Sequence, residues 1–200
     1  PLGRWPVVLG DKVMADKPKP MDPNVEPPGY KPPTSAEELL ERYAKGERYF
    51  QRANLVDANL CGANLRMATF SRADLHGANL SGANLVDTYF LHTNLRLADL
   101  RMADFRMASL FAADLFGVNL EGAALASAAL KDAILNSARL GFTVLGEVDL
   151  SRTTLNNVVH SGPSTIGVDT LKYTAKGLSK DTSNQGAIEA FFVAAVCPMT

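Results

Sequence analysis

Leucine or phenylalanine occupies every fifth position over more than half of the chain. The series begins at Phe50, ends at Leu155 and contains twenty-two positions without an exception. A small residue lies two positions before each member from Leu55 onward, and from 53 to 153 this column contains fifteen Ala, four Thr and two Val. Asn or Asp fills twelve of the twenty-one positions between the two columns, from 54 to 154. An internal repeat is therefore the dominant feature of the sequence.

A five-residue period excludes the two common regular structures. Residues of an α-helix advance by about 100° each, so leucines five apart would form no continuous stripe. Side chains of a long strand alternate between faces, so an odd period would send successive leucines to opposite sides. The pattern instead predicts one short extended stretch and one corner per unit, and the chain then coils around an interior of leucines and small residues. Asn and Asp suit such corners because their side chains hydrogen-bond to nearby backbone.

The repeat unit Ala-(Asp/Asn)-Leu-x-x resembles that of the pentapeptide-repeat family, as residues 53–55, 73–75 and 113–115 illustrate. The resemblance covers residues 48–157. It implies an all-β solenoid, a right-handed quadrilateral β-helix with four units per coil and about 5.5 coils in all. Twenty residues per coil would place an interior column behind each face. The interior positions that we single out are Phe50, Phe70 and Phe90 in one column, Phe105 on a different face, and Leu95 and Leu115.

Residues before the repeat divide into two parts. Nine of the eleven prolines lie in residues 1–33, so we expect 1–34 to be an extended or disordered arm. Residues 35–46 predict a short capping helix, which begins with a capping box and ends at a glycine. Its apolar face comprises Ala36, Leu39, Leu40 and Tyr43.

Residues after the repeat predict a C-terminal cap or linker. The repeat, assigned to 47–157, stops where His160 replaces the expected leucine, so 158–200 forms this segment, with a possible short helix at 186–196. Parts of it, 162–171 and 188–192, resemble a tail that follows pentapeptide repeats in bacterial proteins. A signalling domain such as a TIR domain follows that tail in some of them. One alternative is therefore the targeting or sensing region of a longer bacterial signalling or effector protein.

The charge balance bears on nucleic-acid partners. Twenty Lys and Arg face twenty-one Asp and Glu, a net charge of -1, which makes a nucleic-acid partner unlikely. A second alternative within the family is a DNA mimic that protects a topoisomerase. That role needs a strongly acidic surface. Residues 46–157 contain eleven acidic and ten basic side chains, which disfavours it.

Catalytic chemistry is not indicated by any motif. The three histidines lie on different units, and Cys61 has no neighbouring base in the sequence. We therefore expect no enzyme activity, no cofactor and no metal. No apolar run reaches eighteen residues, and only two cysteines occur, so we expect no membrane span and a cytoplasmic location.

The two positions after each Leu or Phe are expected to face solvent and to carry function. The candidate interaction surface comprises Leu91, Phe111, Phe116, Leu97, Met102, Met107, Arg96, Arg101 and Arg106. Exposed apolar side chains in such number indicate a contact. The leading hypothesis is a non-catalytic scaffold or protein–protein interaction module with a protein partner of unknown identity or a second copy of the chain. Cover by the N-terminal arm or by 158–200 stays open, as does a purely solvated role for the arginines.

Overall fold

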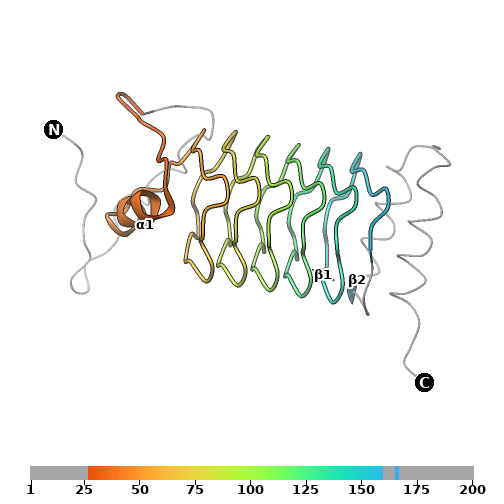
Figure 1. Ribbon diagram of the computed structural model, residues 1–200. Helices are drawn as coiled ribbons and strands as arrows, with labels where there is room; N and C mark the ends of the chain where they lie inside the picture. The colour runs from red at the N-terminus through yellow and green to blue at the C-terminus, as the bar shows by residue number, and fades with distance from the viewer. Residues whose placement is uncertain (1–26, 160–164, 167–200) are drawn as a thin grey trace, which may run out of the picture.

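The computed structural model describes residues 27–159 and 165–166. The chain forms a row of stacked coils, with helix α1 (Ala36–Ala44) at one end of the row. Toward the other end, strand β1 (Val144–Leu145) pairs in parallel with strand β2 (Thr165–Ile166) (Figure 1). The predicted arm, apart from residues 27–34, and the predicted helix at 186–196 lie outside the described residues.

Parallel pairing at an interval of twenty residues holds successive coils together. Asn54 bridges to Asp74, Asp74 to Asn94 and Asn94 to Asp114, and the other three faces repeat this pattern. The amide of Leu55 donates to the carbonyl of Asp74 at 2.8 Å, so each coil satisfies the backbone of its neighbour. Four five-residue units therefore make one coil.

A tight turn separates each unit from the next. The amide of Ala73, for example, donates to the carbonyl of Phe70 at 2.9 Å. The third residue of the turn has positive φ at all twenty-two corners, from 52 to 157, as a type II turn requires. Five of these residues are glycines and seventeen are not. The left-handed conformation costs a non-glycine residue about 1 kcal/mol, so the ladder imposes this turn against local preference.

The interior contains the predicted aromatic column. Phe50 stacks on Phe70 with ring centroids 5.7 Å apart, and Phe70 stacks on Phe90 at 5.4 Å. Phe105 projects from a different face, and its ring lies 5.8 Å from that of Phe90 at an angle of 53°. All four rings are fully buried, as are the leucines of the same coils. The aromatic rings therefore fill the N-terminal half of the interior.

Threonines in the small-residue column bury their hydroxyl groups without loss of hydrogen bonds. Thr93 Oγ1 donates to the carbonyl of Phe70 at 2.8 Å, and Thr143 Oγ1 donates to that of Leu120 at 2.9 Å. Thr88 and Thr153 make the equivalent bond to the residue twenty-three positions earlier. A buried hydroxyl without a partner would destabilise the fold. Threonine therefore substitutes for alanine at these positions at little cost.

Leucine occupies every interior Leu/Phe position of the C-terminal coils, from Leu110 to Leu155. A cavity of about 10 Å³ lies among the leucines from Leu120 to Leu155. Its lining is apolar and it has no polar groups to bind water, so we expect it to be dry. The absence of phenylalanine from these coils explains why the gap occurs here.

Helix α1 packs its buried side against the first coil. Ser35 Oγ accepts from the amide of Glu38 at 3.2 Å, which forms the predicted N-cap. Leu39 is fully buried, and the Tyr43 ring lies 6.5 Å from that of Phe50. The prediction of Leu40 on the apolar face was wrong, because that side chain is exposed. The first coil covers only the side of the helix that carries Ala36 and Leu39, and Leu40 projects beside this contact.

The ladder continues beyond the missing leucine at position 160. β2 pairs with β1 in a register of twenty-one residues, with Val144 opposite Thr165 and Leu145 opposite Ile166. Earlier coils use twenty, as Arg139 opposite Val159 shows. One extra residue between 159 and 165 therefore separates β2 from the regular repeat, and the backbone pairing resumes after it.

Candidate interaction surface

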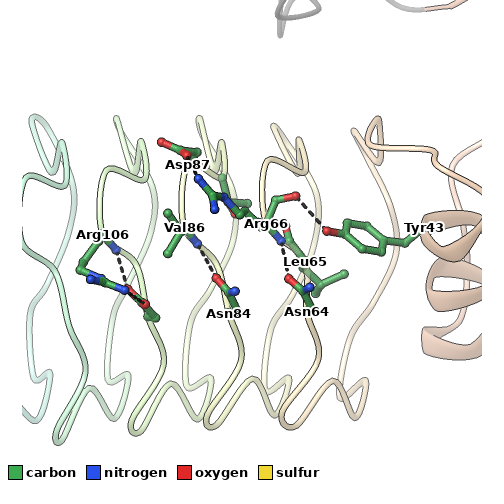
Figure 2. A network of polar contacts seen from close by, with 10 residues as sticks. Tyr43, Asn64, Leu65, Arg66, Asn84, Val86, Asp87 and Arg106 are labelled. Carbon is green, nitrogen blue, oxygen red and sulfur yellow. Dashed lines mark hydrogen bonds and ion pairs between the residues drawn. The ribbon is translucent and has the colours of Figure 1, made fainter. Parts of the chain in front are cut away.

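Asn and Asp residues connect the strands to the corners. Those of the repeat column lie at the bridging position before a Leu or Phe, and nearly all accept a hydrogen bond from the amide two residues later. Figure 2 shows two such bonds, from the amide of Arg66 to Asn64 Oδ1 at 3.4 Å and from the amide of Val86 to Asn84 Oδ1 at 3.3 Å. Eleven of the twelve Asn and Asp residues in this column make the bond. The predicted link to nearby backbone is thus confirmed, although these residues precede the corner rather than occupy it.

Arg96 joins two coils at one corner. Its guanidinium carbon lies 4.4 Å from the centre of the Phe116 ring, and its Nη1 lies 3.2 Å from Asp114 Oδ2. Both partners belong to the coil that follows Arg96. The ring, the cation and the carboxylate therefore restrain one another at the surface.

The neighbouring corner is apolar. Leu91 and Phe111 are twenty residues apart, so they occupy equivalent positions on successive coils, and both are half-buried. The ring of His92 meets that of Phe111 edge-on at 5.8 Å. Asp114 lies on the strand between this corner and that of Phe116. Ile134 of the following coil bridges to Asp114 and is exposed. We call the set Leu91, Phe111, Phe116 and Ile134, with the Arg96–Asp114 pair among them, the aromatic surface.

Leu97, Met102 and Met107 occupy three successive corners of one coil and do not share a face. Their exposed fractions are 56%, 71% and 64%. Each also has positive φ, so these positions combine apolar exposure with a disfavoured backbone conformation. Leu97 and Met102 extend over Gly117 and Gly122 of the next coil, in space that a Cβ at either glycine would need. The sequence grouped these residues with the aromatic surface, but Met102 and Met107 lie around the coil from it.

The three arginines of this coil are each paired with a carboxylate. Arg101 Nη2 lies 2.6 Å from Asp99 Oδ2, and Arg106 Nη2 lies 2.6 Å from Asp104 Oδ2. The hydrogen bond from each arginine side chain lowers the pKa of its aspartate below the ordinary value. Arg96 pairs with Asp114, as above. These arginines therefore do not form a free cationic patch for an anionic partner.

Polar contacts dominate the face that begins beside α1. Arg66 Nη2 pairs with Asp87 Oδ2 at 3.1 Å, and the Tyr43 hydroxyl donates to the carbonyl of Arg66 at 3.0 Å (Figure 2). Burial raises the pKa of Tyr43, which favours the protonated hydroxyl that donates this bond. The helix is thus hydrogen-bonded as well as packed to the coils.

Some outward positions differ from the expectation of solvent exposure. Gln51 and Ser71 follow Phe50 and Phe70, yet both side chains are buried. The hydroxyl of Tyr30 donates to the Gln51 carbonyl at 2.9 Å. The segment before α1 therefore reaches this corner, which the five-residue pattern could not indicate.

Ile134, Phe142 and Val144 are further exposed apolar side chains that the candidate surface did not include. Phe142 is at a corner, whereas the other two are at bridging positions. A signal for the other two was present: Asn or Asp fills eleven of the fourteen bridging positions from 54 to 119, but only one of the seven from 124 to 154. The absence of Asn or Asp at the bridging position thus marks the strands on which an apolar residue such as Ile134 or Val144 points outward.

Reactive and metal-binding groups are sparse in residues 27–159 and 165–166. That region contains no cluster of three His, Cys, Asp or Glu side chains that could bind a metal ion. Cys61 is exposed and accepts a hydrogen bond from Ser81 Oγ at 3.2 Å. None of the helices described there is long and apolar enough to cross a membrane.

A family model for pentapeptide repeats matches the chain in eight copies, over residues 53–90, 73–110 and 113–157. These matches span just over half of the 200 residues, so the chain belongs to the pentapeptide-repeat family. A search of curated protein sequences found no match.

Solved pentapeptide-repeat structures resemble the chain. HetL, involved in heterocyst differentiation regulation in the cyanobacterium Nostoc sp. strain PCC 7120, is 29% identical over 66% of this chain and 69% of its own, with a TM-score of 0.53. A trypsin-treated form of QnrB1, a plasmid-mediated fluoroquinolone resistance protein, is 22% identical over 60% of this chain and 62% of its own, with a TM-score of 0.50, and shows the fold alone. A pentapeptide repeat protein of the Arabidopsis thaliana thylakoid lumen is 28% identical over 56% of this chain and 82% of its own, with a TM-score of 0.45.

Proposed function

We propose that this protein is a non-catalytic interaction module that binds a protein partner through its aromatic surface. The observation that carries the proposal is the cluster of Phe111, Phe116 and Arg96 on two adjacent coils. Aromatic residues and arginine dominate the energetics of protein interfaces. A packed, regularly paired column restrains them in place, which lowers the entropy lost on binding.

The charges of the coils favour a protein over a nucleic acid as the partner. The arginines of the central coil are matched by Asp99, Asp104 and Asp114 at hydrogen-bonding distance. A nucleic-acid surface needs unpaired cations in a row. Conversely, a DNA mimic needs unpaired carboxylates, so the same pairs disfavour the topoisomerase-protecting alternative. QnrB1 supports only the shared fold.

The architecture that we propose for the whole chain is a right-handed quadrilateral β-helix of about 5.5 coils. In this proposal α1 caps its N-terminal end, residues 47–157 form its body, and residues 158–200 cap its C-terminal end or link to a following domain. The contacts of Leu39 and Tyr43 with the first coil support the N-terminal cap. A cytoplasmic location is proposed with it.

The likeness to HetL bears on the kind of activity that we propose. HetL is described by its involvement in heterocyst differentiation regulation, and we propose by likeness that this chain also has a regulatory role, exercised through binding. The targeting region of a longer signalling protein is the alternative with the same mechanism, since it also requires a binding surface.

Quantitative cross-linking and affinity purification from native cells would test the proposal. Three forms are compared: the wild type, Phe111→Ser with Phe116→Ser, and the matched control Met67→Ser, which alters an exposed apolar residue at a corner away from the aromatic surface. We expect the double variant to lose cross-linked proteins that the control retains. An identical set of proteins from all three forms would contradict the proposal.

Sedimentation equilibrium of the same three forms tests whether the partner is a second copy. A dimer that dissociates only in the double variant would identify self-association through the aromatic surface. A monomer in all three forms would assign the surface to a different protein.

A further inference from the structure

A second apolar area lies on a different face of the column, toward its C-terminal end. Phe142 and Val144 are 58% and 40% exposed, and Val144 bridges to the half-buried Ala124 of the preceding coil. Met102 shares its corner column with Phe142 and extends over Gly122, which lies between them. We call Met102, Ala124, Phe142 and Val144 the C-terminal apolar patch.

The N-terminal half of the same face is polar. Its bridging positions hold Asn64 and Asn84, and the ion pair between Arg66 and Asp87 lies at its edge (Figure 2). At the bridging positions of this face, apolar side chains therefore begin only with Ala124 and Val144, in the last coils. Exposed apolar side chains gathered in this way indicate a surface that is covered in the functional protein.

The chain leaves the described structure beside this patch. β2 pairs with β1, so the backbone of Thr165 lies directly opposite Val144. Residues 167–200 follow from that point. An apolar segment within residues 167–200 is therefore tethered close to the patch. The tether gives that segment a high effective concentration at the patch.

Residues 187–196 contain such a sequence. Nine of these ten residues are apolar, including Phe191 and Phe192, and Glu189 is the only charged one. A segment that is apolar on all sides must be buried to be stable in water. The connecting residues 167–186 span at most about 70 Å when extended, which is ample reach for any part of the patch.

We infer that residues 187–196 dock on the C-terminal apolar patch of the same chain. The segment thereby covers the outward face of the last coils with its phenylalanines, which is distinct from closing the open end of the interior. This contact lies away from the aromatic surface and does not depend on the function proposed for it.

Paramagnetic relaxation measured by NMR on the full 200-residue chain tests the docking. Cys61 is replaced by Ser, and a nitroxide is attached to Cys197, which immediately follows the segment. We expect the amide signals of Gly122, Ala124 and Val144 to lose most of their intensity, whereas those of Asn94 and Asp114 on the opposite face keep theirs. Loss confined to Leu150 and Leu155 would instead place the segment at the end of the column and overturn the inference.

Two controls identify what covers the patch. Phe191→Ser with Phe192→Ser keeps the label but removes the aromatic anchors, and we expect the signals of the patch to recover. The second control mixes nitrogen-15-labelled chain without nitroxide with unlabelled chain that carries it. Loss of patch signals in that mixture would assign the cover to a second copy and overturn docking within one chain, as would unchanged signals in the single-chain sample.

Discussion

The guanidinium of Arg96 lies 4.4 Å from the centre of the Phe116 ring in the next coil. The same guanidinium pairs with Asp114, so one side chain bridges two coils through a cation–π contact and an ion pair. Because the pair is partly exposed, the cation–π contact is expected to contribute about 0.5–1 kcal/mol. A double-mutant cycle with Arg96→Ala and Phe116→Leu, followed by urea unfolding, measures this coupling. Additive effects of the two substitutions would show that the contact contributes nothing to stability.

The stacked rings of Phe50, Phe70 and Phe90 predict a large cost for truncation of the middle one. Phe70→Ala removes a fully buried ring from the column and should lower the free energy of unfolding by about 3–5 kcal/mol. Met67→Ala truncates an exposed apolar side chain outside both apolar surfaces and serves as the control. Chemical denaturation of both variants checks the difference, and equal losses would contradict the role of the column.

Leu95 and Leu97 are two residues apart and have opposite environments. Leu95→Asp would bury an unpaired charge in the interior, so the variant should not fold. Leu97→Asp should fold normally, because Leu97 is exposed and aspartate tolerates its positive φ of 59° better than leucine. Circular dichroism and gel filtration report the outcome. A folded, monodisperse Leu95→Asp protein would overturn the interior assignment.

Corner residues predict opposite effects for two exchanges between glycine and alanine. Gly82 has φ of 65° with no atom near the site of an added Cβ, so Gly82→Ala should destabilise by about 1 kcal/mol through backbone strain alone. Ala112 has φ of 52°, so Ala112→Gly should relieve comparable strain and stabilise the protein by several tenths of a kcal/mol or more. Thermal melts of both variants measure these shifts. Destabilisation by Ala112→Gly would show that chain entropy outweighs the strain.

Asp104 should make stability dependent on pH in the acid range. The hydrogen bond from the Arg106 side chain lowers the pKa of Asp104 in the folded protein. Its stabilising contribution is therefore complete above the unfolded value of about 3.9 and is lost as the pH falls through the lowered folded value. Asp104→Asn removes that contribution but keeps an oxygen for the Arg106 amide, as Asn84 does for Val86 in the preceding coil.

Urea titrations at neutral pH and at stepwise lower pH compare the two proteins. We expect the wild type to be the more stable at neutral pH and the difference to shrink as the pH falls below about 4. A difference that stays constant with pH would show that Asp104 titrates alike in the folded and unfolded chains.

The five-residue period determined most of the fold by itself. Its regularity required one turn and one interior position per unit, and the spacing of Phe50, Phe70 and Phe90 indicated the aromatic column before any coordinate was known. The pattern also marked which side chains point outward, since in each unit only the Leu or Phe and the small residue turn inward. Gln51 is an exception that the period could not indicate, because Tyr30, from a segment outside the repeat, contacts it.

Tertiary structure decided which outward residues meet. Arg96 contacts Asp114 and Phe116 because the next coil places them within its reach. These residues are eighteen and twenty positions away, and the sequence does not indicate which rotamer Arg96 adopts. The same stacking places Met102 and Met107 at corners away from the aromatic surface. It also pairs Thr165 of β2 with Val144, despite one extra residue in the connection. The sequence by itself determined the coil, because the five-residue unit repeats an interior Leu or Phe, a small residue and the same turn. Only the stacked coils decided the surfaces, because these form between units that are distant along the chain.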